Sequence, residues 1–363
     1  ILESYRKSGE NCVNQFEGMW AFLIFDIRKK KVFMSRDRFG EKPFYYYHSN
    51  EVFCFGSEPK FIFSLLNKKL DIDIQKLTKY LVCGYRSYFK KRDTFFCKLE
   101  ELEPATNLIM DLNLKKKKYK YWNLKFSPTN LSELNIYERS KELLCESMKI
   151  RLRSDVPLAF CLSGGLDSSS LAAITRKTFG RNIHTFSIVD KDPRYDESEN
   201  IKKITSFLKC NSTIIETSKD NFLERMEKII LYYNAPIPTI SYYVHNLLSE
   251  KIKENGYSVV ISGTGADEIF TGYYDHYSFW LNVMKKNKNF DIYLQERENG
   301  YGRYINNPLL KNPLKIIDDD KFRGHLYQGS EYFSDLLLNK IDVSFSEENF
   351  SNDCLRNRMM NEL

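Results

Sequence analysis

Short apolar and aromatic blocks separated by polar turns fill the first third of the chain, and this pattern is typical of successive β-strands. The longest block, residues 16–26, is followed by the polar residues 28–31. No helical spacing interrupts the blocks, so we expect a sheet-dominated region over residues 16–63. The further elements expected here are a strand at 32–34, a hairpin of 44–48 and 52–55, a short helix and loop within 71–90, and a hairpin of 108–111 and 119–122 that turns at lysines 115–118.

The pattern changes near Ser127 and Pro128, after which apolar residues recur at helical spacing. Short apolar strands then alternate with helices, which predicts a parallel sheet with right-handed crossovers. Beyond Phe270 the chain is expected to be helical, with polar loops. The expected strands are 156–162, 185–189, 213–215 and 258–261, and the expected helices are 131–153, 168–178, 197–208, 222–232 and 244–253.

The composition is that of a globular protein of about two domains. Of the 363 residues, 42% are hydrophobic and 28% are charged, which excludes a disordered chain. No apolar run reaches the roughly 18 residues of a membrane helix, so no membrane partner is expected. The net charge of +7 comes from lysine runs spread along the chain, whereas nucleic-acid binders gather basic residues on one face. We therefore expect no nucleic-acid partner.

The cysteines carry no metal or redox signature. None of the eight forms a C-x-x-C pair, which argues against a zinc site or a thioredoxin-type motif. Their neighbours are mostly apolar, as at Cys54, Cys97 and Cys161. Buried, reduced thiols are therefore expected, and a cytoplasmic location fits them.

The strongest chemical signal is Ser-Gly-Gly-Leu-Asp-Ser-Ser at residues 163–169, between an expected strand and an expected helix. Gly164 and Gly165 let the backbone bend closely around an anion, which also faces the N–H groups that begin the helix. Asp167 would repel a phosphate directly, so its expected role is to hold Mg²⁺ that bridges to the phosphates. Hydroxyl donors would come from Ser163, Ser168 and Ser169.

This loop lacks the G-x-x-x-x-G-K-[ST] spacing of γ-phosphate loops and suits a pyrophosphate that leaves as one unit. A second turn, Ser-Gly-Thr-Gly-Ala-Asp-Glu at residues 262–268, follows the last clear strand. Parallel strands end at one sheet edge, where open α/β sheets bind ligands. Asp267 is therefore expected to join Asp167 at one cation, and Ser262 and Gly263 to approach the nucleotide.

Other polar residues have plainer interpretations. Asp196, Glu197 and Glu199 precede an expected helix, whose positive N-terminal end favours acidic residues. None of the five histidines has metal-ligand spacing with a partner, so surface or core roles are expected. The aromatic residues of 44–55 are expected to pair across a hairpin rather than to stack on a ligand.

With these motifs the chain resembles the glutamine-dependent asparagine synthetase family. Residues 163–169 are similar to the pyrophosphatase-type ATP loop of that family, and residues 262–273 to its second nucleotide-site motif. The front of the chain agrees independently, and the resemblance extends over about residues 10–275. The segments similar to the family's glutaminase domain are Phe-Glu-Gly-Met-Trp-Ala-Phe at 16–22, Arg-Asp-Arg-Phe-Gly-Glu-Lys-Pro-Phe-Tyr at 36–45 and Gly-Ser-Glu-Pro-Lys at 56–60.

The resemblance implies an α/β fold combined with a β-rich part. Residues 1–125 would be the C-terminal part of an Ntn-type glutaminase, an α+β sandwich. Residues 128–363 would be a parallel-sheet ATP-pyrophosphatase domain, adenine nucleotide alpha hydrolase-like and incomplete at its C-terminus. The implied reaction is that of a glutamine-hydrolysing asparagine synthase: ATP and Mg²⁺ adenylate the aspartate β-carboxylate, and glutamine-derived ammonia gives asparagine, AMP and pyrophosphate. The expected partners are thus small molecules, and a homodimer is left open.

The resemblance also assigns site residues. The catalytic positions would be Asp167, Thr264, Asp267 and Glu268, with Asp167 and Asp267 as metal ligands. ATP or pyrophosphate would be bound by Leu162, Ser163, Gly164, Gly165, Leu166, Asp167, Ser168, Ser169, Ile188, Ser262 and Gly263.

Two departures from the family pattern shape these expectations. The family's glutaminase nucleophile is an N-terminal Cys, whereas residue 1 here is Ile and Cys12 lies in a later segment, so the chain is expected to be a fragment that does not hydrolyse glutamine. Thr264 stands where asparagine-forming members commonly have Glu, and a hydroxyl is a poor base at neutral pH. Amidation of another carboxylate, for example a sugar acid in surface-polysaccharide biosynthesis, therefore stays open, as does a nucleotide-binding partner without turnover.

Overall fold

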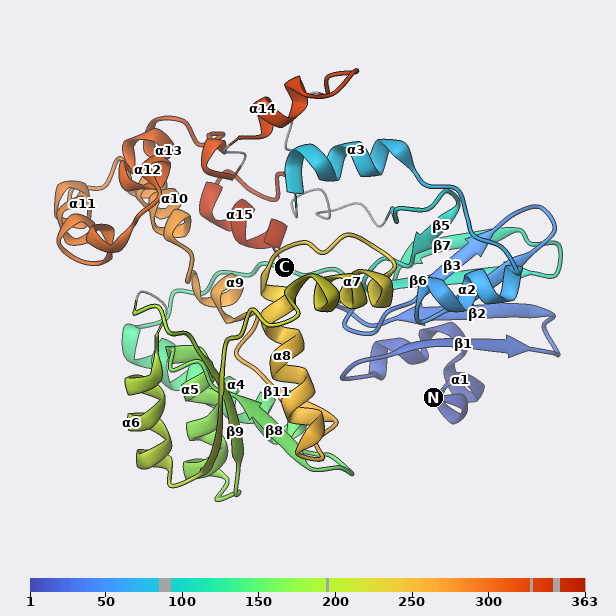
Figure 1. Cartoon of the computed structure of the whole chain (residues 1–363), viewed down its shortest axis with the longest axis horizontal. Helices are drawn as coiled ribbons and strands as arrows, with labels where there is room; N and C mark the ends of the chain where they lie inside the picture. Colours follow the sequence, from blue (N-terminus) through green and yellow to red (C-terminus); the bar gives the residue numbers. More distant parts are fainter. Residues whose placement is uncertain (85–92, 194–195, 327–328, 342–346, 363) are drawn as a thin grey trace. The chain divides into compact units, whose positions relative to one another are not determined.

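The computed structural model describes residues 1–84, 93–193, 196–326, 329–341 and 347–362 (Figure 1). The chain forms two compact units. Unit 1 comprises Ile1–Thr129 with Met226–Thr239 and Tyr332–Ile341, and unit 2 comprises Asn130–Arg225, Ile240–Glu331 and Asp342–Leu363. Helix α7, Phe222–Tyr233, therefore runs across a boundary between the two units.

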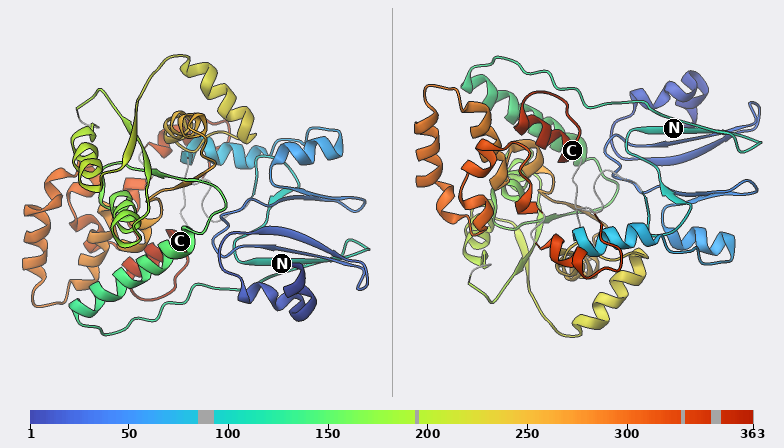
Figure 2. Two further views of the ribbon diagram at one scale, coloured as in Figure 1. Left: turned by 90° about the horizontal axis from the view of Figure 1, so that it is seen from below. Right: turned by 90° about the horizontal axis from the view of Figure 1, so that it is seen from above.

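Unit 1 is built on two antiparallel sheets, with strand orders β1-β2-β6-β7 and β4-β3-β5. The N-terminal helices lie beside the first sheet (Figure 2). Their residues Tyr5, Cys12 and Val13 form a core cluster with Trp20, just before β1, and with Ile24 and Phe33 of the sheet. The strands are β1 Ala21–Asp26, β2 Lys31–Arg36, β3 Tyr45–His48, β4 Phe53–Gly56, β5 Leu99–Glu101, β6 Thr106–Asp111 and β7 Lys116–Lys120. The helices are α1 Leu2–Ser8, the 3-10 helix η1 Gly9–Gln15, α2 Pro59–Leu66, α3 Ile74–Cys83 and, in a later segment, α14 Ser330–Asp335, which begins in unit 2.

The predicted hairpins of unit 1 are confirmed, with two local corrections. Strand structure ends at Gly56, and residues 59–63 belong to α2, because Pro59 at the first helical position suits a helix start. The lysines 115–118 do not form the turn: β7 already begins at Lys116, and Asp111 Oδ1 closes the turn by accepting from Asn113 N at 2.9 Å. The helix expected within 71–90 is α3, and residues 85–90 lie outside the described part of the chain.

The aromatic residues of the 44–55 hairpin pair with one another, as predicted. The ring of Phe44 stacks on that of Phe55 at 5.9 Å, and the ring of Tyr46 on that of Phe53 at 5.8 Å. Both pairs join β3, or the residue just before it, to β4, so this aromatic cluster is explained by cross-strand packing.

Unit 2 contains the predicted parallel sheet, in the order β10-β9-β8-β11. Helices cover both faces: Met148 and Ala172 pack on one, and Ile252 on the other. The strands are β8 Leu158–Cys161, β9 His184–Val189, β10 Asn211–Glu216 and β11 Val259–Ile261. The helices around them are α4 Glu133–Arg151, α5 Leu166–Ala173, which continues as the π-helix η3 Ile174–Thr178, α6 Ser198–Leu208, α7 and α8 Ser241–Glu254.

Beyond Phe270 the chain is helical, as predicted, and these helices pack on a small core of Phe279, Ile316 and Cys354. The elements are α9 Ala266–Phe270, α10 Tyr274–Met284, α11 Phe290–Asn299, η4 Tyr301–Tyr304, α12 Pro308–Lys311, α13 Leu314–Asp318, η5 Gly324–Leu326 and α15 Cys354–Glu362. No helix among the described residues is long and apolar enough to cross a membrane.

All eight cysteines are free thiols, and the prediction that they are buried holds only in part. Four are buried, whereas Cys97 is exposed although it follows Phe96. The reason is local: residue 97 lies in the turn just before β5, where a side chain faces outward. The buried thiols are those of Cys12, Cys54, Cys83 and Cys354.

Candidate active site

Two glycine-containing turns leave the same edge of the parallel sheet in unit 2 (Figure 1). Strands β8 and β11 are direct parallel neighbours, with Phe160 opposite Ile261. The turns that follow them, residues 162–165 and 262–265, therefore begin side by side. The sequence prediction that both turns share one sheet edge is confirmed.

The first turn is held by its own serines and leads into α5. Ser168 Oγ accepts a hydrogen bond from Ser163 N at 3.2 Å, and Ser169 Oγ donates to Gly165 O at 2.6 Å. Gly164 has a φ of +85°, and no side chain caps the start of α5 at Gly165. The serine hydroxyls thus shape the turn, and the first N–H groups of α5 are left for an anion.

The second turn approaches the first so closely that only glycine fits at position 263. A Cβ on Gly263 would lie 2.8 Å from Ser168 N and 2.9 Å from Asp167 Cβ. Both distances are shorter than ordinary van der Waals contact, and both neighbours belong to the first turn of α5. Gly263 therefore sets the distance between the two turns.

A second close approach lies at the end of α9. A Cβ on Gly272 would lie 1.8 Å from Asp267 Oδ1 and 3.0 Å from Asp267 Cα. Gly272 N also donates to Asp267 O at 2.9 Å. The Asp267 carboxylate thus occupies the space that any side chain at residue 272 would need.

The two turns bring like charges together. Burial raises the pKa of Asp267, repulsion by the carboxylates of Asp167 and Glu268 raises it further, and the interaction with His276 opposes the shift. Carboxylate oxygens are suitable ligands for Mg²⁺, and a cation here would relieve the repulsion. No group of three His, Cys, Asp or Glu side chains that could hold a metal exists among the described residues, so water or phosphate oxygens would complete the coordination.

The other predicted residues lie around this edge with different exposures. The side chain of Leu162 is buried, at 1% exposed, whereas that of Leu166 is 82% exposed at the start of α5. Ile188 lies on β9, next to β8, two residues beyond Phe186, whose carbonyl accepts from Leu162 N at 3.0 Å. Ser262 Oγ donates to exposed Thr264 Oγ1 at 3.0 Å.

Glu268 does not stand free beside the turn. Its Oε1 accepts a hydrogen bond from Tyr273 Oη at 2.7 Å, and its Oε2 is buried without a partner among the described residues. Glu268 is therefore already fixed by a neighbouring side chain.

The acidic residues before α6 take the structural role that their position predicts. Asp196 Oδ1 accepts from Ser198 N at 2.9 Å at the helix start, and Glu199 lies in the first turn.

Sequence reasoning missed the residues that support the second turn. Gly272 and Tyr273 lie within the motif of residues 262–273, but no individual role was predicted for them. His276 was expected to have only a surface or core role. His276 is fully buried and pairs with Glu362, which lies 86 residues further along the chain. A pairing across that separation leaves no signal in a single sequence.

A cavity of about 470 Å³ lies elsewhere in unit 2, between residues 320–323 and 347–357. None of the predicted site residues lines it. Its main charged groups, Arg323 and Glu347, are paired with each other, with Arg323 Nε donating to Glu347 Oε1 at 2.9 Å. The chemistry of the two turns, rather than the cavity, therefore marks the candidate site.

Two family models of known proteins match the chain, one in its N-terminal part and one in its later part. A family model described as a glutamine amidotransferase domain matches residues 1–122, and one described as asparagine synthase matches residues 139–319. Among solved structures, a glutamine-dependent NAD⁺ synthetase from Acinetobacter baumannii matches 75% of this chain and 65% of its own chain, at 13% identity and a TM-score of 0.28.

Several curated relatives match over three quarters of the chain. The putative asparagine synthetase [glutamine-hydrolyzing] 2 of Methanocaldococcus jannaschii is 38% identical over 282 residues, which are 76% of this chain and 53% of the relative. Asparagine synthetase [glutamine-hydrolyzing] 1 of Bacillus subtilis is 27% identical over 277 residues, 75% of this chain and 42% of the relative. Amidase chry2 of Gibberella zeae is 26% identical over 302 residues, again 75% and 42%.

The chain spans about half the length of the curated relatives that it matches. Within that span, the two family models follow one another in the order of a glutaminase part and a synthetase part. The two sequence motifs on which the resemblance rests lie in the adjacent turns of unit 2. On these grounds the chain belongs to the glutamine-hydrolysing asparagine synthetase family.

Proposed function

We propose that the complete protein is an ATP-dependent carbon–nitrogen ligase that takes its amide nitrogen from glutamine. Residues 1–125 would belong to an Ntn-type glutaminase domain and residues 128–363 to the ATP-pyrophosphatase domain. Family membership and the relatives named as glutamine-hydrolysing asparagine synthetases support this proposal. A cytoplasmic location and a homodimer remain predictions.

One observation carries the synthetase half of the proposal, namely the contact between the two turns. Gly263 lies against Asp167 and Ser168 of α5, and the carboxylates of Asp167 and Asp267 repel each other. This arrangement offers an uncapped helix start for a phosphate and two carboxylates for a cation within one small region.

The chemistry that fits is carboxylate activation. A substrate carboxylate oxygen attacks the α-phosphorus of ATP, the α–β bridging bond breaks, and pyrophosphate leaves. Ammonia then attacks the acyl carbon, the carbon–oxygen bond to AMP breaks, and an amide results. Bound Mg²⁺ would neutralise the charge of the leaving pyrophosphate.

The chain's own residues have defined tasks in this proposal. The α5 N–H groups and the turn of residues 163–165 would hold the pyrophosphate, and Asp167 and Asp267 would hold the cation. Ile188, Ser262 and Gly263 would contact the nucleotide. Thr264 would lie nearest to the reacting carboxyl, and Glu268 would be a structural or metal-shell carboxylate behind it.

The acceptor carboxylate is the less defined part. Aspartate is our first proposal because two of the relatives are named asparagine synthetases. Thr264 favours a second candidate, a different carboxylate, because its hydroxyl lacks the basicity of a carboxylate at that position. Relatives named as amidases are compatible with this second candidate. A nucleotide-binding protein without turnover is the third.

Exchange of labelled pyrophosphate into ATP separates these candidates when it is measured on the full-length protein. Exchange that depends on aspartate supports the first, and exchange that depends only on another acid supports the second. Nucleotide binding without exchange for any acid tested would refute the ligase proposal.

The role of Asp167 needs its own variant and control. We expect Asp167→Asn to lower the exchange rate at least 100-fold, because one of two metal-binding carboxylates is lost. Glu199→Gln removes an exposed carboxylate on α6, which pairs with Lys203 at 3.9 Å, and should leave exchange unchanged. Near-parental exchange in Asp167→Asn would contradict the assignment.

A further inference from the structure

The carboxylates of α9 are held from behind by a chain of polar contacts. Tyr273 Oη donates to Glu268 Oε1 at 2.7 Å, and Glu268 directly follows Asp267. Burial and the neighbouring carboxylates raise the pKa of Tyr273 far above its usual value, so its hydroxyl remains a donor. The ring of Tyr273 meets the ring of His276 edge-on at 5.2 Å. These contacts thus connect α9, which follows the second turn, to the N-terminal end of α10.

His276 is the central member of this chain. Its side chain is fully buried, and Nε2 lies 2.7 Å from Glu362 Oε2 on α15. Its Nδ1 is buried without a hydrogen-bond partner among the described residues. A buried imidazole with one unsatisfied nitrogen costs folding free energy, which is typical of a group retained for function.

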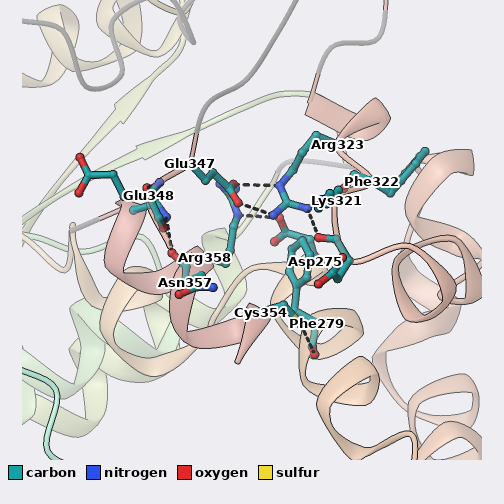
Figure 3. Close-up of polar contacts among 12 residues, drawn as sticks. Asp275, Phe279, Lys321, Phe322, Arg323, Glu347, Glu348, Cys354, Asn357 and Arg358 are labelled. Atoms are coloured by element: carbon teal, nitrogen blue, oxygen red, sulfur yellow. Dashed lines mark hydrogen bonds and ion pairs between the residues drawn. The ribbon is translucent and has the colours of Figure 1, made fainter. Parts of the chain in front are cut away.

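Glu362 is itself fixed by a buried ionic network. Arg358 Nη2 lies 2.7 Å from Glu362 Oε1, and Arg358 Nε donates to Asp275 Oδ2 at 3.1 Å. Figure 3 shows Glu347 between Arg323 and Arg358, with the distance from Arg358 Nη1 to Glu347 Oε1 being 3.7 Å. Helix α15 is thereby tied to α10 on one side and to the segment before η5 on the other.

We propose that Tyr273, His276 and Glu362 are positioning residues that hold the Asp267–Glu268 pair in place for a magnesium-bound nucleotide. The proposal deepens the function proposed above and rests on it. The physical need is plain, since Asp167, Asp267 and Glu268 repel one another when no cation lies between them. A hydrogen bond to Glu268 and the imidazole of His276 limit how far this repulsion can move α9. Outer partners of this kind typically change metal affinity by 10–100-fold.

The simpler alternative is that these residues only stabilise the packing of α10 on α15. The two interpretations differ in what a single lost hydroxyl does. Tyr273→Phe keeps the ring and its contact with His276 but leaves Glu268 without its donor. If the hydroxyl only stabilises the fold, nucleotide affinity should not depend on it at temperatures where the protein is folded.

The experiment uses the full-length protein and isothermal titration calorimetry with ATP, with Mg²⁺ and with EDTA. We expect Tyr273→Phe to weaken binding of Mg²⁺–ATP about tenfold and to leave metal-free ATP binding unchanged. Tyr274→Phe is the matched control, since Tyr274 is adjacent and exposed, and its ring stacks on Tyr301. Parental Mg²⁺–ATP affinity in Tyr273→Phe would overturn the proposal.

A second pair of variants tests His276 and guards against loss of folding. His276→Gln retains an N–H that can reach Glu362, whereas His276→Ala does not. We expect His276→Gln to recover at least half of the Mg²⁺-dependent ATP affinity that His276→Ala loses, with binding measured below the melting temperature of each variant. Equal Mg²⁺ effects in His276→Gln and His276→Ala would refute the role of the Glu362 contact.

Failure of the proposed function is distinguishable from failure of this inference. A parent protein that binds Mg²⁺–ATP but exchanges pyrophosphate with no acid refutes the ligase reaction, while the Tyr273→Phe comparison still decides the positioning role. A parent protein that binds ATP equally well with and without Mg²⁺ overturns both.

Discussion

Replacing Gly263 by alanine tests the contact on which the candidate site depends. The added Cβ would lie 2.8 Å from Ser168 N and 2.9 Å from Asp167 Cβ, where ordinary contact begins at 3.4 Å. Neither neighbour can rotate away, because one is a backbone atom and the other is a Cβ attached to the backbone. The second turn must therefore retreat from α5 by at least 0.6 Å, the difference between 2.8 and 3.4 Å.

The size of the effect follows from this displacement. Overpacking of one methyl group costs about 1–3 kcal/mol of folding stability. A misplacement of about 1 Å near reacting groups costs roughly 100-fold in rate. A retreat of 0.6 Å is therefore expected to lower pyrophosphate exchange by about 10–100-fold. The nucleotide should still bind through the first turn, so kcat should fall more than the KM for ATP rises.

The assay is pyrophosphate exchange of the full-length protein, with thermal unfolding measured in parallel. Gly180→Ala is the matched control, since Gly180 has a φ of +63° but a Cβ there would meet nothing within 4 Å. The strained backbone should cost a comparable 1–2 kcal/mol without moving either turn. Parental exchange in Gly263→Ala, or an equal loss of exchange in Gly180→Ala, would refute the reasoning.

Three further predictions concern other parts of the structure. Gly272→Ala should push the Asp267 carboxylate aside and weaken Mg²⁺–ATP binding about tenfold in calorimetry. Metal-free ATP binding is the internal control, and an unchanged dependence of ATP binding on Mg²⁺ would contradict the prediction. Burial alone would raise the pKa of Asp275, but His325 and Arg358 hold that pKa well below its usual value. The Asp275 carboxylate therefore stabilises the folded state at neutral pH, and this stabilisation is lost as the pH falls below about 4. In Asp275→Asn, the free energy of unfolding measured with urea should fall less at acid pH than in the parent protein. An unchanged fall would contradict the assignment. Arg36 donates hydrogen bonds to three carbonyl oxygens and pairs with Glu101. Arg36→Lys should therefore lower the free energy of unfolding, measured with urea, by about 2–3 kcal/mol. A loss below about 0.5 kcal/mol would contradict a stabilising role of these hydrogen bonds.

Much of unit 2 could be predicted from the sequence because local signals agree with the tertiary structure there. The strands around Phe160 and Phe186 are short apolar runs buried on both faces, and the helices between them have apolar residues at regular spacing. The two turns were recognisable because Gly164 and Gly263 closely follow short apolar strands, β8 and β11. Their roles in binding remain predictions, whereas their adjacency is a property of the sheet.

The rest required contacts that a sequence does not display. Residues 59–63 were predicted to belong to the sheet-dominated region, yet Pro59 begins helix α2 there. The strand β7 was hidden because Lys116 and its neighbours resemble a polar turn, although they pair with the apolar strand β6.

The support of the second turn was hidden for a different reason. His276 and Glu362 meet only because α10 and α15 pack together, and nothing near either residue in the sequence indicates the pairing. Pair contacts between distant helices are fixed by packing, which a single sequence does not reveal.

Strand β11 differs from β8 in how firmly it is held. It pairs over just three residues, lies at the sheet edge, and exposes Val259 and Val260, whereas β8 has a neighbour on both sides. Short edge strands open at low free energy, so amide hydrogens of 259–265 should exchange with deuterated solvent sooner than those of 158–165. A ligand that bridges both turns would slow exchange mostly in the later segment. The candidate site would thus combine one firmly paired half with one weakly paired half, and ligand binding would be detected mainly in the second.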